Sequence, residues 1–218
     1  MTLRNSPSRP RSLGSPSRRV ALEDILRQDW DRLFDATPTA SPFSRWTFHR
    51  AWWDAYGAAA EPRYLVLGES EVQAIVPLML RPPTATSAGS VFMAASYHAD
   101  YATALGRPSD MAGVAAATVA HLAQLFDEEP WLARVDLRRM RGGDPFLEHL
   151  ARELEERAVE LGWSVRLDRE DVCPRINLGG DWNELLESMS KKARHEVRRK
   201  LRRAQHEGTP QLRYMPLD

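Results

Sequence analysis

The stretch YLVLGESEVQAIVPLML, residues 64–80, decides the fold class of this 218-residue chain. Residues 64–67 and 72–80 are rich in branched apolar side chains, and the segment Gly-Glu-Ser-Glu at 68–71 separates them. Two such runs joined by a short Gly-containing turn predict a β-hairpin. Pro77 cannot donate to a strand ladder, so it indicates an edge or a bulge in the return strand.

Helical and strand patterns alternate on both sides of this hairpin. Before it, apolar periodicity predicts helices over residues 22–35 and 45–56, separated by the proline-containing break at 38–42. After it, the patterns predict strands at 90–95, 131–137, 163–167 and 174–178, and helices at 110–126 and 144–161. Ser109 and Asp144 are the expected N-caps of these two helices, and Gly162 is the expected end of the second. We therefore expect an α/β (α+β) fold, with a mixed sheet covered by helices on both faces.

The two ends of the chain differ from this central part. Residues 1–19 are mostly Ser, Pro and Arg, which predicts disorder, so the first folded domain is expected over residues 20–179. After residue 180, Asp181 and Glu184 form a capping box, and Ser190 can cap a further helix to about residue 207. A strand is expected at 212–215. A helix pair with one strand cannot bury its own apolar face, so residues 180–218 are expected to be the start of a truncated second domain.

Composition restricts the class of protein. An apolar fraction of 43% allows a real core, and no apolar run approaches the ~20 residues of a membrane span. Cys173 is the single cysteine, so a reducing, cytoplasmic location is expected. No His/Cys cluster has the spacing of a metal site. Residues 20–189 carry 16 basic and 27 acidic residues, whereas residues 190–207 carry eight Lys/Arg and two acids.

The order of elements and several local motifs resemble the GNAT acetyltransferases. The motifs are Ser44-Arg45-Trp46 with Ala51-Trp52-Trp53, Ile75-Val76-Pro77-Leu78-Met79, Asp100-Tyr101, Asp171-Val172-Cys173-Pro174, and the basic run at 190–203. Together, over roughly residues 25–216, they are similar to bacterial CelD-type (cellulose-biosynthesis-associated) acetyltransferases, distant relatives of the two-domain Fem peptidyltransferases. The resemblance implies an acyltransferase that moves an acyl group from acetyl-CoA or another acyl-CoA to an amine or hydroxyl of a small-molecule, saccharide or peptide acceptor.

The resemblance also implies where the donor would bind. GNAT domains hold the coenzyme A pyrophosphate at a helix start with the pattern Arg/Gln-x-x-Gly-x-Gly/Ala, where free N–H groups meet the phosphates. Here the equivalent residues 106–113 contain Pro108, which lacks an N–H, and Asp110, a carboxylate. We therefore expect this domain to have lost its cofactor site. The fragment then shapes the acceptor cleft, and the donor site lies mainly in the second domain.

Three groups of residues are candidates for function. Asp100 and Tyr101 follow the third strand, near where GNAT folds open their cleft, so the carboxylate could act as a base and the phenol as an acid. A loop Asp bonded to its own backbone beside a half-buried Tyr is the alternative. Trp53 could line the acceptor wall, or pack in the core. In the basic helix, Lys192, Arg194, Arg198 and Arg202 could bind a substrate anion, or could belong to a solvated face.

Two other functions remain open from the sequence. The basic helix 190–207 could make the chain an anionic-polymer or nucleic-acid binding module, although the charge run alone does not favour nucleic acid as a partner. The domain could instead be a catalytically silent GNAT-like scaffold. The patterns do not predict an oligomeric state.

Overall fold

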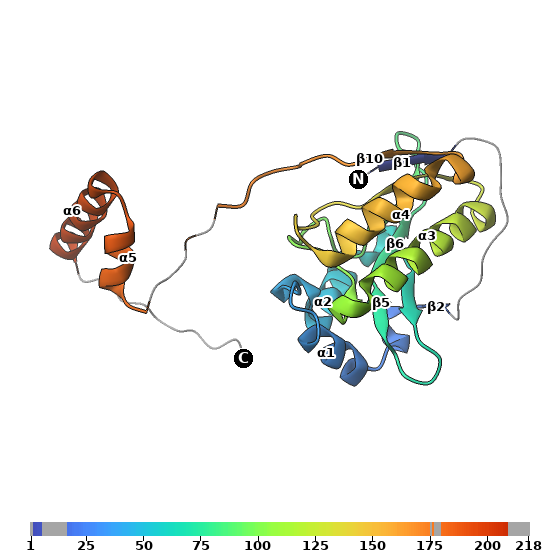
Figure 1. Ribbon diagram of the computed structural model, residues 1–218, viewed down its shortest axis with the longest axis horizontal. Helices are drawn as coiled ribbons and strands as arrows, with labels where there is room; N and C mark the ends of the chain where they lie inside the picture. The colour runs from blue at the N-terminus through green and yellow to red at the C-terminus, as the bar shows by residue number, and fades with distance from the viewer. Residues whose placement is uncertain (1, 6–16, 175, 177–179, 209–218) are drawn as a thin grey trace. The chain divides into compact units, whose positions relative to one another are not determined.

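The computed structural model describes residues 2–5, 17–174, 176 and 180–208 (Figure 1). They form two compact units, Met1–Glu170 and Asp171–Asp218, here named unit 1 and unit 2. The boundary thus lies nine residues before the one expected from the sequence. Each unit is described by itself.

Unit 1 is a mixed α/β structure. Its α-helices are α1 Arg27–Asp35, α2 Trp46–Tyr56, α3 Met111–Glu128 and α4 Pro145–Leu161. Short 3-10 turns lie at Leu22–Asp24, Pro42–Ser44, Gly57–Ala59 and Pro108–Asp110. The strands are β1 Thr2–Asn5, β2 Ser17–Val20, β3 Glu61–Pro62, β4 Tyr64–Leu67, β5 Ala74–Val76, β6 Leu78–Arg81, β7 Gly89–Met93, β8 Leu105–Gly106, β9 Leu132–Asp136 and β10 Trp163–Arg166.

These strands form two sheets. A six-stranded sheet has the order β10-β1-β9-β7-β6-β3, and a four-stranded sheet has the order β2-β4-β5-β8. Between these strands the β7–β9 pair is parallel, with Val91 opposite Val135, and the other pairs are antiparallel. The α+β class expected from the sequence is confirmed, but the strands form two sheets where one mixed sheet was expected.

Pro77 is the point at which one run of chain passes between the two sheets. The hairpin pairs β4 with β5, with Leu65 opposite Val76, as predicted. The expected return strand at 72–80 is broken, because β5 ends at Val76 and β6 begins at Leu78 in the other sheet. Pro77 has no N–H to donate, but its carbonyl still accepts from the Ala94 N–H at 2.7 Å.

Helices cover both faces of the sheets, as expected. Alternate residues of each strand point to opposite faces. Leu65, Val76 and Val91 pack in one core with α3 and α4, which lie side by side in Figure 1. Tyr64 and Ile75, on the opposite face, pack in a second core with residues of α1 and α2.

The helix ends confirm one N-cap of unit 1 and correct the other. Asp144 Oδ1 accepts from the backbone N–H of Phe146 at 2.9 Å and of Leu147 at 3.3 Å, and Gly162 ends α4 with φ of 65°. Ser109 does not cap α3, because it lies in the 3-10 turn before the helix and its hydroxyl donates to Asp110.

The first residues of the chain require a correction. We expected disorder over residues 1–19, but Thr2–Asn5 forms β1 between β10 and β9, and Ser17–Val20 forms β2 against β4. Residues 6–16 lie outside the described part of the chain, so the expectation is not tested there. Strand pairing uses backbone N–H and C=O groups, which every residue except proline supplies in full. A segment poor in apolar side chains can therefore join a sheet whose neighbouring strands supply the core.

Unit 2 contains α5 Trp182–Ser188 and α6 Lys191–Glu207. Asp181 is the N-cap of α5, as expected, since its Oδ1 accepts from the Asn183 and Glu184 N–H groups. The reciprocal bond of the expected capping box is displaced by one residue, because Glu184 Oε2 accepts from the Gly180 N–H and not from the Asp181 N–H. Ser190 Oγ accepts from the Ala193 N–H, as expected. The strands expected at 174–178 and 212–215 fall mostly or wholly outside the described residues, and a second GNAT-like domain stays a prediction.

Within the described parts of the chain, no helix combines the length and apolarity needed to cross a membrane.

Candidate functional site

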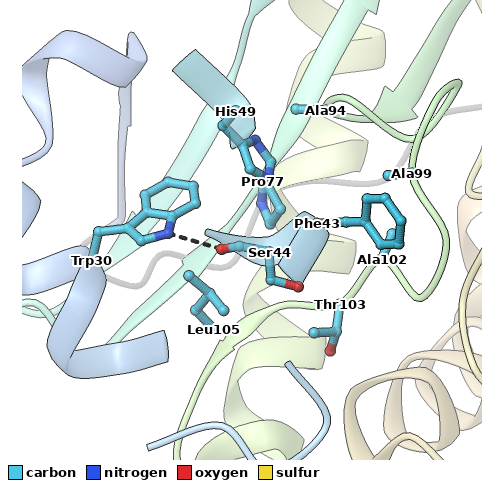
Figure 2. Close-up of a pocket in the computed structure, with 10 residues that line it drawn as sticks. All are labelled: Trp30, Phe43, Ser44, His49, Pro77, Ala94, Ala99, Ala102, Thr103 and Leu105. Atoms are coloured by element: carbon cyan, nitrogen blue, oxygen red, sulfur yellow. Dashed lines mark hydrogen bonds between the residues drawn. The ribbon is translucent and has the colours of Figure 1, made fainter. Parts of the chain in front are cut away.

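A small pocket lies where the two sheets separate. Pro77 between β5 and β6, Ala94 after β7 and Leu105 at the start of β8 form part of its wall (Figure 2). The other lining residues are Trp30, Phe43, Ser44, His49, Ala99, Ala102 and Thr103. The space is about 10 Å³, which is close to what a single water needs. A ligand larger than a water therefore does not fit inside this pocket.

His49 is the titratable side chain of the pocket wall. It is held by a hydrogen bond to the Tyr64 hydroxyl, which Trp53 holds in turn. Its Nδ1 lies 2.8 Å from the Tyr64 hydroxyl, and Trp53 Nε1 donates to the same hydroxyl at 2.8 Å. Because the indole can only donate, the Tyr64 hydroxyl accepts from Trp53 and shares a second hydrogen bond with His49 Nδ1. Trp30 packs against the imidazole, with ring centroids 5.0 Å apart.

Burial keeps this pair uncharged. It lowers the pKa of His49 to about 3 and raises the pKa of Tyr64 above its usual value. His49 is therefore a neutral imidazole near pH 7, suited to donating a hydrogen bond and poorly suited to holding a proton. Sequence reasoning missed both residues. The spacing of His49 and Trp53, four residues apart on one helix face, was the available signal.

We expect Tyr64→Phe to lower the free energy of unfolding by about 2–3 kcal/mol, because Trp53 Nε1 and His49 Nδ1 both lose their partner. Tyr56→Phe is the matched control, since Tyr56 is 52% exposed and its hydroxyl can bond to water. Urea unfolding followed by circular dichroism measures both. Equal, small effects in the two variants would show that the buried hydroxyl contributes no net stability.

An exposed aromatic surface lies next to the end of α2. Tyr56 stacks on His98 with centroids 4.2 Å apart, and Tyr97, 72% exposed, meets the edge of His98 at 5.0 Å. Trp52 Nε1 donates to His98 Nδ1 at 3.1 Å, and this hydrogen bond fixes the orientation of the imidazole. Tyr56, Tyr97 and His98 together form this aromatic surface. Trp53, expected to line an acceptor wall, is half-buried and its indole N–H is directed to Tyr64 instead.

The predicted pair Asp100 and Tyr101 lies in the loop beside this surface. Asp100 is exposed, and its Oδ1 lies 3.9 Å from Arg139 Nη1, while its carbonyl accepts weakly from Ser41 Oγ at 3.4 Å. Tyr101 is partly buried, with φ of 60°. Ala99 and Ala102 line the pocket, whereas Asp100 and Tyr101 do not. The structure thus places the two residues at the rim and gives Asp100 a cationic neighbour.

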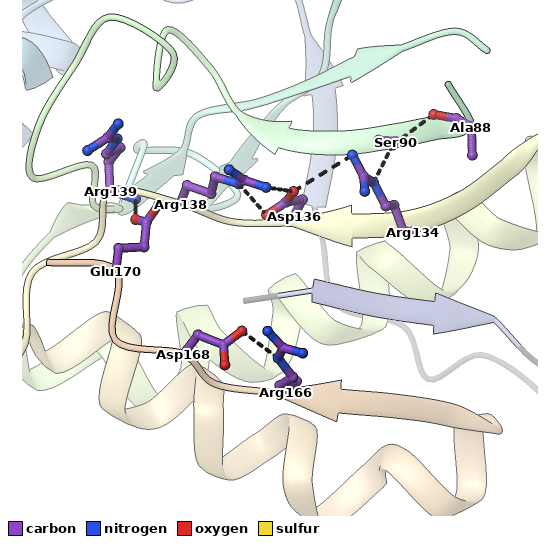
Figure 3. A network of polar contacts seen from close by, with 9 residues as sticks. All are labelled: Ala88, Ser90, Arg134, Asp136, Arg138, Arg139, Arg166, Asp168 and Glu170. Atoms are coloured by element: carbon purple, nitrogen blue, oxygen red, sulfur yellow. Dashed lines mark hydrogen bonds and ion pairs between the residues drawn. The ribbon is translucent and has the colours of Figure 1, made fainter. Parts of the chain in front are cut away.

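A network of polar contacts at the end of β9 holds the backbone next to this loop (Figure 3). The sequence did not predict this network. Asp136, almost fully buried at the end of β9, accepts two hydrogen bonds of 2.9 Å from Arg138, which raise the pKa of that guanidinium. The Arg139 N–H donates to Glu170 at 2.8 Å, and the Arg139 carbonyl accepts from the Ala102 N–H at 2.7 Å. The network therefore fixes the backbone that carries Asp100 and Tyr101.

The start of α3 does not fit the phosphates of coenzyme A. The hollow beside it is lined by the β4–β5 turn and the first turns of α3. Its charged lining residues are Glu69, Glu71 and Asp110, and its lining includes no Lys or Arg. Glu71 is paired with Arg32 at 3.2 Å, but the carboxylates of Glu69 and Asp110 would repel a pyrophosphate, and Pro108 supplies no N–H in the preceding turn. Acyl-CoA is therefore not expected to bind at this place, and the loss of the cofactor site from this domain stays a prediction.

The basic candidates lie on α6 in unit 2. Lys192, Arg198 and Arg202 are exposed, whereas Arg194 is partly buried and its Nη2 donates to the Met189 carbonyl at 3.3 Å. Cys173 is a free, exposed thiol. Across the residues that the structure describes, no group of three or more His, Cys, Asp or Glu side chains could hold a metal ion.

The fold defines a mixed α/β protein with a pocket where its two sheets diverge. Comparison with protein-family models, with curated proteins and with solved structures found no match to this chain. The function proposed next therefore depends on the side chains of this chain and on the motifs of its sequence.

Proposed function

We propose that unit 1 is the acceptor-binding part of an acyltransferase of the GNAT type. The observation that carries the proposal is the divergence of the two sheets at Pro77, with neutral His49 in the pocket wall and the aromatic surface near it. Ligand sites commonly combine apolar and aromatic walls with a few fixed polar groups. Asp100 and Tyr101, held at the rim by the Arg139 backbone, would contact an amine or hydroxyl acceptor.

The acyl donor has no fitting site at α3. The carboxylates beside that helix disfavour phosphate, so unit 1 contributes acceptor recognition and no step of acyl transfer is assigned to it. Tyr56 and Tyr97 offer flat apolar faces with polar edges, which suit a sugar ring or an extended peptide. A saccharide or peptide acceptor is therefore the class that we propose.

The test compares acceptor and donor binding on the full chain. We expect a glucosamine oligosaccharide or a lysine-containing peptide to raise the melting temperature, and acetyl-CoA alone to leave it unchanged. The double variant Tyr56→Ala/Tyr97→Ala should abolish the acceptor shift, because it removes two exposed rings from the proposed site. Trp182→Ala, which removes a 49% exposed ring from α5, is the matched control and should retain it.

Calorimetric titration with acetyl-CoA tests whether the donor binds to unit 1, which would contradict the proposal. Binding that weakens when Ser109 or Gly113 at the α3 start is replaced by Asp would place the donor in unit 1 and contradict the proposal. An acceptor shift that survives the Tyr56/Tyr97 double variant would move the acceptor site away from the aromatic surface.

A further inference from the structure

Helix α6 carries an unusual density of positive charge. Its 17 residues include eight Lys/Arg and two acids, Glu196 and Glu207. Every basic side chain of the helix other than Arg194 is exposed. The sequence alone left open whether acidic groups elsewhere in the fold neutralise this charge.

The pairing within unit 2 leaves most of that charge uncompensated. Glu196 accepts two hydrogen bonds from Arg199, at 2.7 and 2.9 Å, and lies 3.8 Å from Lys200. These contacts, the Arg199 hydrogen bonds first, lower the pKa of Glu196. Asp181 and Glu184 are engaged as helix caps. Among the described residues of unit 2, no carboxylate forms an ion pair with Lys192, Arg198 or Arg202.

The unpaired cations are spread along the helix instead of converging on one point. From Lys192 to Arg202 the helix rises ~15 Å, at about 1.5 Å per residue. Arg194, Arg198 and Arg202 follow one another at every fourth position and share one face. One strand of duplex DNA presents about four phosphates over the same ~15 Å. A linear row of phosphates fits this distribution better than a single small anion does.

The apolar side of α6 disfavours a lipid surface. It consists of Ala193, Val197, Leu201 and Ala204, all small or medium-sized, and Leu201 is 39% exposed. Helices that lie in a membrane interface bury larger side chains such as Trp, Phe and several Leu. The charged face, and not the apolar stripe, is therefore the surface that recognises a partner.

We propose that α6 binds the phosphodiester backbone of duplex nucleic acid without reading its bases. Arginine and lysine that neutralise phosphates release counterions, so affinity must fall steeply with salt. Arg198 and Arg202 are the principal contacts on this face, and Lys192 adds a cation on an adjacent face of the first turn. Arg194, which donates to the Met189 carbonyl, fixes the first turns of the helix. This inference is independent of the function proposed for unit 1.

The test is fluorescence anisotropy of labelled 20-base-pair duplex DNA and RNA with the full chain at 50, 100 and 200 mM salt. Binding is expected at 50 mM, with equal affinity for unrelated sequences. The triple variant Lys192→Gln/Arg198→Gln/Arg202→Gln should flatten the slope of log affinity against log salt by about 2.7, since each lost phosphate contact removes about 0.9. Glu196→Gln should strengthen binding, because it removes the acid inside the basic helix.

The matched control is Arg107→Gln/Arg141→Gln/Arg152→Gln, which removes the same charge from unit 1. Circular dichroism confirms that both triple variants keep their helix content. The proposal is overturned if the duplex does not bind at 50 mM salt, or if the two triple variants weaken binding equally. Preferential binding to vesicles of anionic phospholipid would also overturn it, and would assign α6 to a membrane surface.

Discussion

Lowering the pH from 7 to 5 is expected to reduce the free energy of unfolding by up to about 4 kcal/mol, through two buried histidines. Burial lowers the pKa of His49 to about 3. The pKa of His121 on α3 falls to about 4, through burial first and then the charges of Arg19 and Arg63, against the opposing effect of Glu128.

The sign follows from the protons that each state binds. In the unfolded chain a histidine has a pKa near 6.5, so it takes up a proton as the pH falls below about 6.5. The folded state does not take up that proton until the pH approaches 4 or 3. Stability is therefore full above pH 6.5 and is lost progressively below it, by about 1.4 kcal/mol per pH unit for each histidine.

Urea unfolding at pH 7, 6 and 5 measures this dependence, and His121→Leu separates the two contributions. His121 Nε2 has no hydrogen-bond partner among the described residues, so leucine replaces it without leaving a polar group unpaired. That variant should lose about half of the pH dependence. His195→Gln, at an exposed position of α6, should lose none of it. An unchanged slope in His121→Leu would contradict the assignment.

Replacing Trp30 by alanine should cost about 3–5 kcal/mol of unfolding free energy. The side chain is fully buried in the core between the α1/α2 layer and the sheets. Its Nε1 donates to the Ser44 carbonyl at 2.9 Å, and its ring contacts His49 and Tyr64. The substitution removes that packing, takes away the donor to the Ser44 carbonyl and enlarges the pocket that Trp30 lines.

Trp182→Ala is the matched control for this prediction, because the same atoms are removed from a half-exposed position on α5. It should change the unfolding free energy by less than about 1 kcal/mol. Since both variants lose a fluorophore, circular dichroism is the appropriate signal. If Trp30→Ala were as mild as the control, the second core would not support the pocket, and the site proposed there would lose its structural basis.

Local signals were sufficient for the helices and the hairpin. Asp144-Pro145 at the start of α4 and Gly162 at its end are both found, because caps depend on residues within a few positions of each other. The β4 strand and its turn are found for the same reason. Ser109 failed as a cap because the preceding Pro108 favours a 3-10 turn that shifts the helix start.

The candidate site was predicted only in part. Asp100 and Tyr101 were identified from their place after a strand, and the structure puts them at a rim held by Arg139. His49 and Tyr64 lie 15 positions apart in the sequence and meet only because α2 packs on β4. Asp136 and Arg138 were not singled out, since a charged residue at a strand end usually faces solvent.

The sequence by itself determined the four long helices of unit 1, the β4–β5 hairpin, the caps Asp144 and Gly162 and the distribution of charge, because these depend on neighbouring residues. It did not determine β1 and β2, which were expected to be disordered, or the cap expected at Ser109. The tertiary structure decided that Pro77 divides one strand run between two sheets and that β1 enters between β9 and β10. It also brought Trp53, Tyr64 and His49 into one hydrogen-bonded group. Pairing between distant segments depends on burial and backbone hydrogen bonding across the whole fold, which no local pattern encodes.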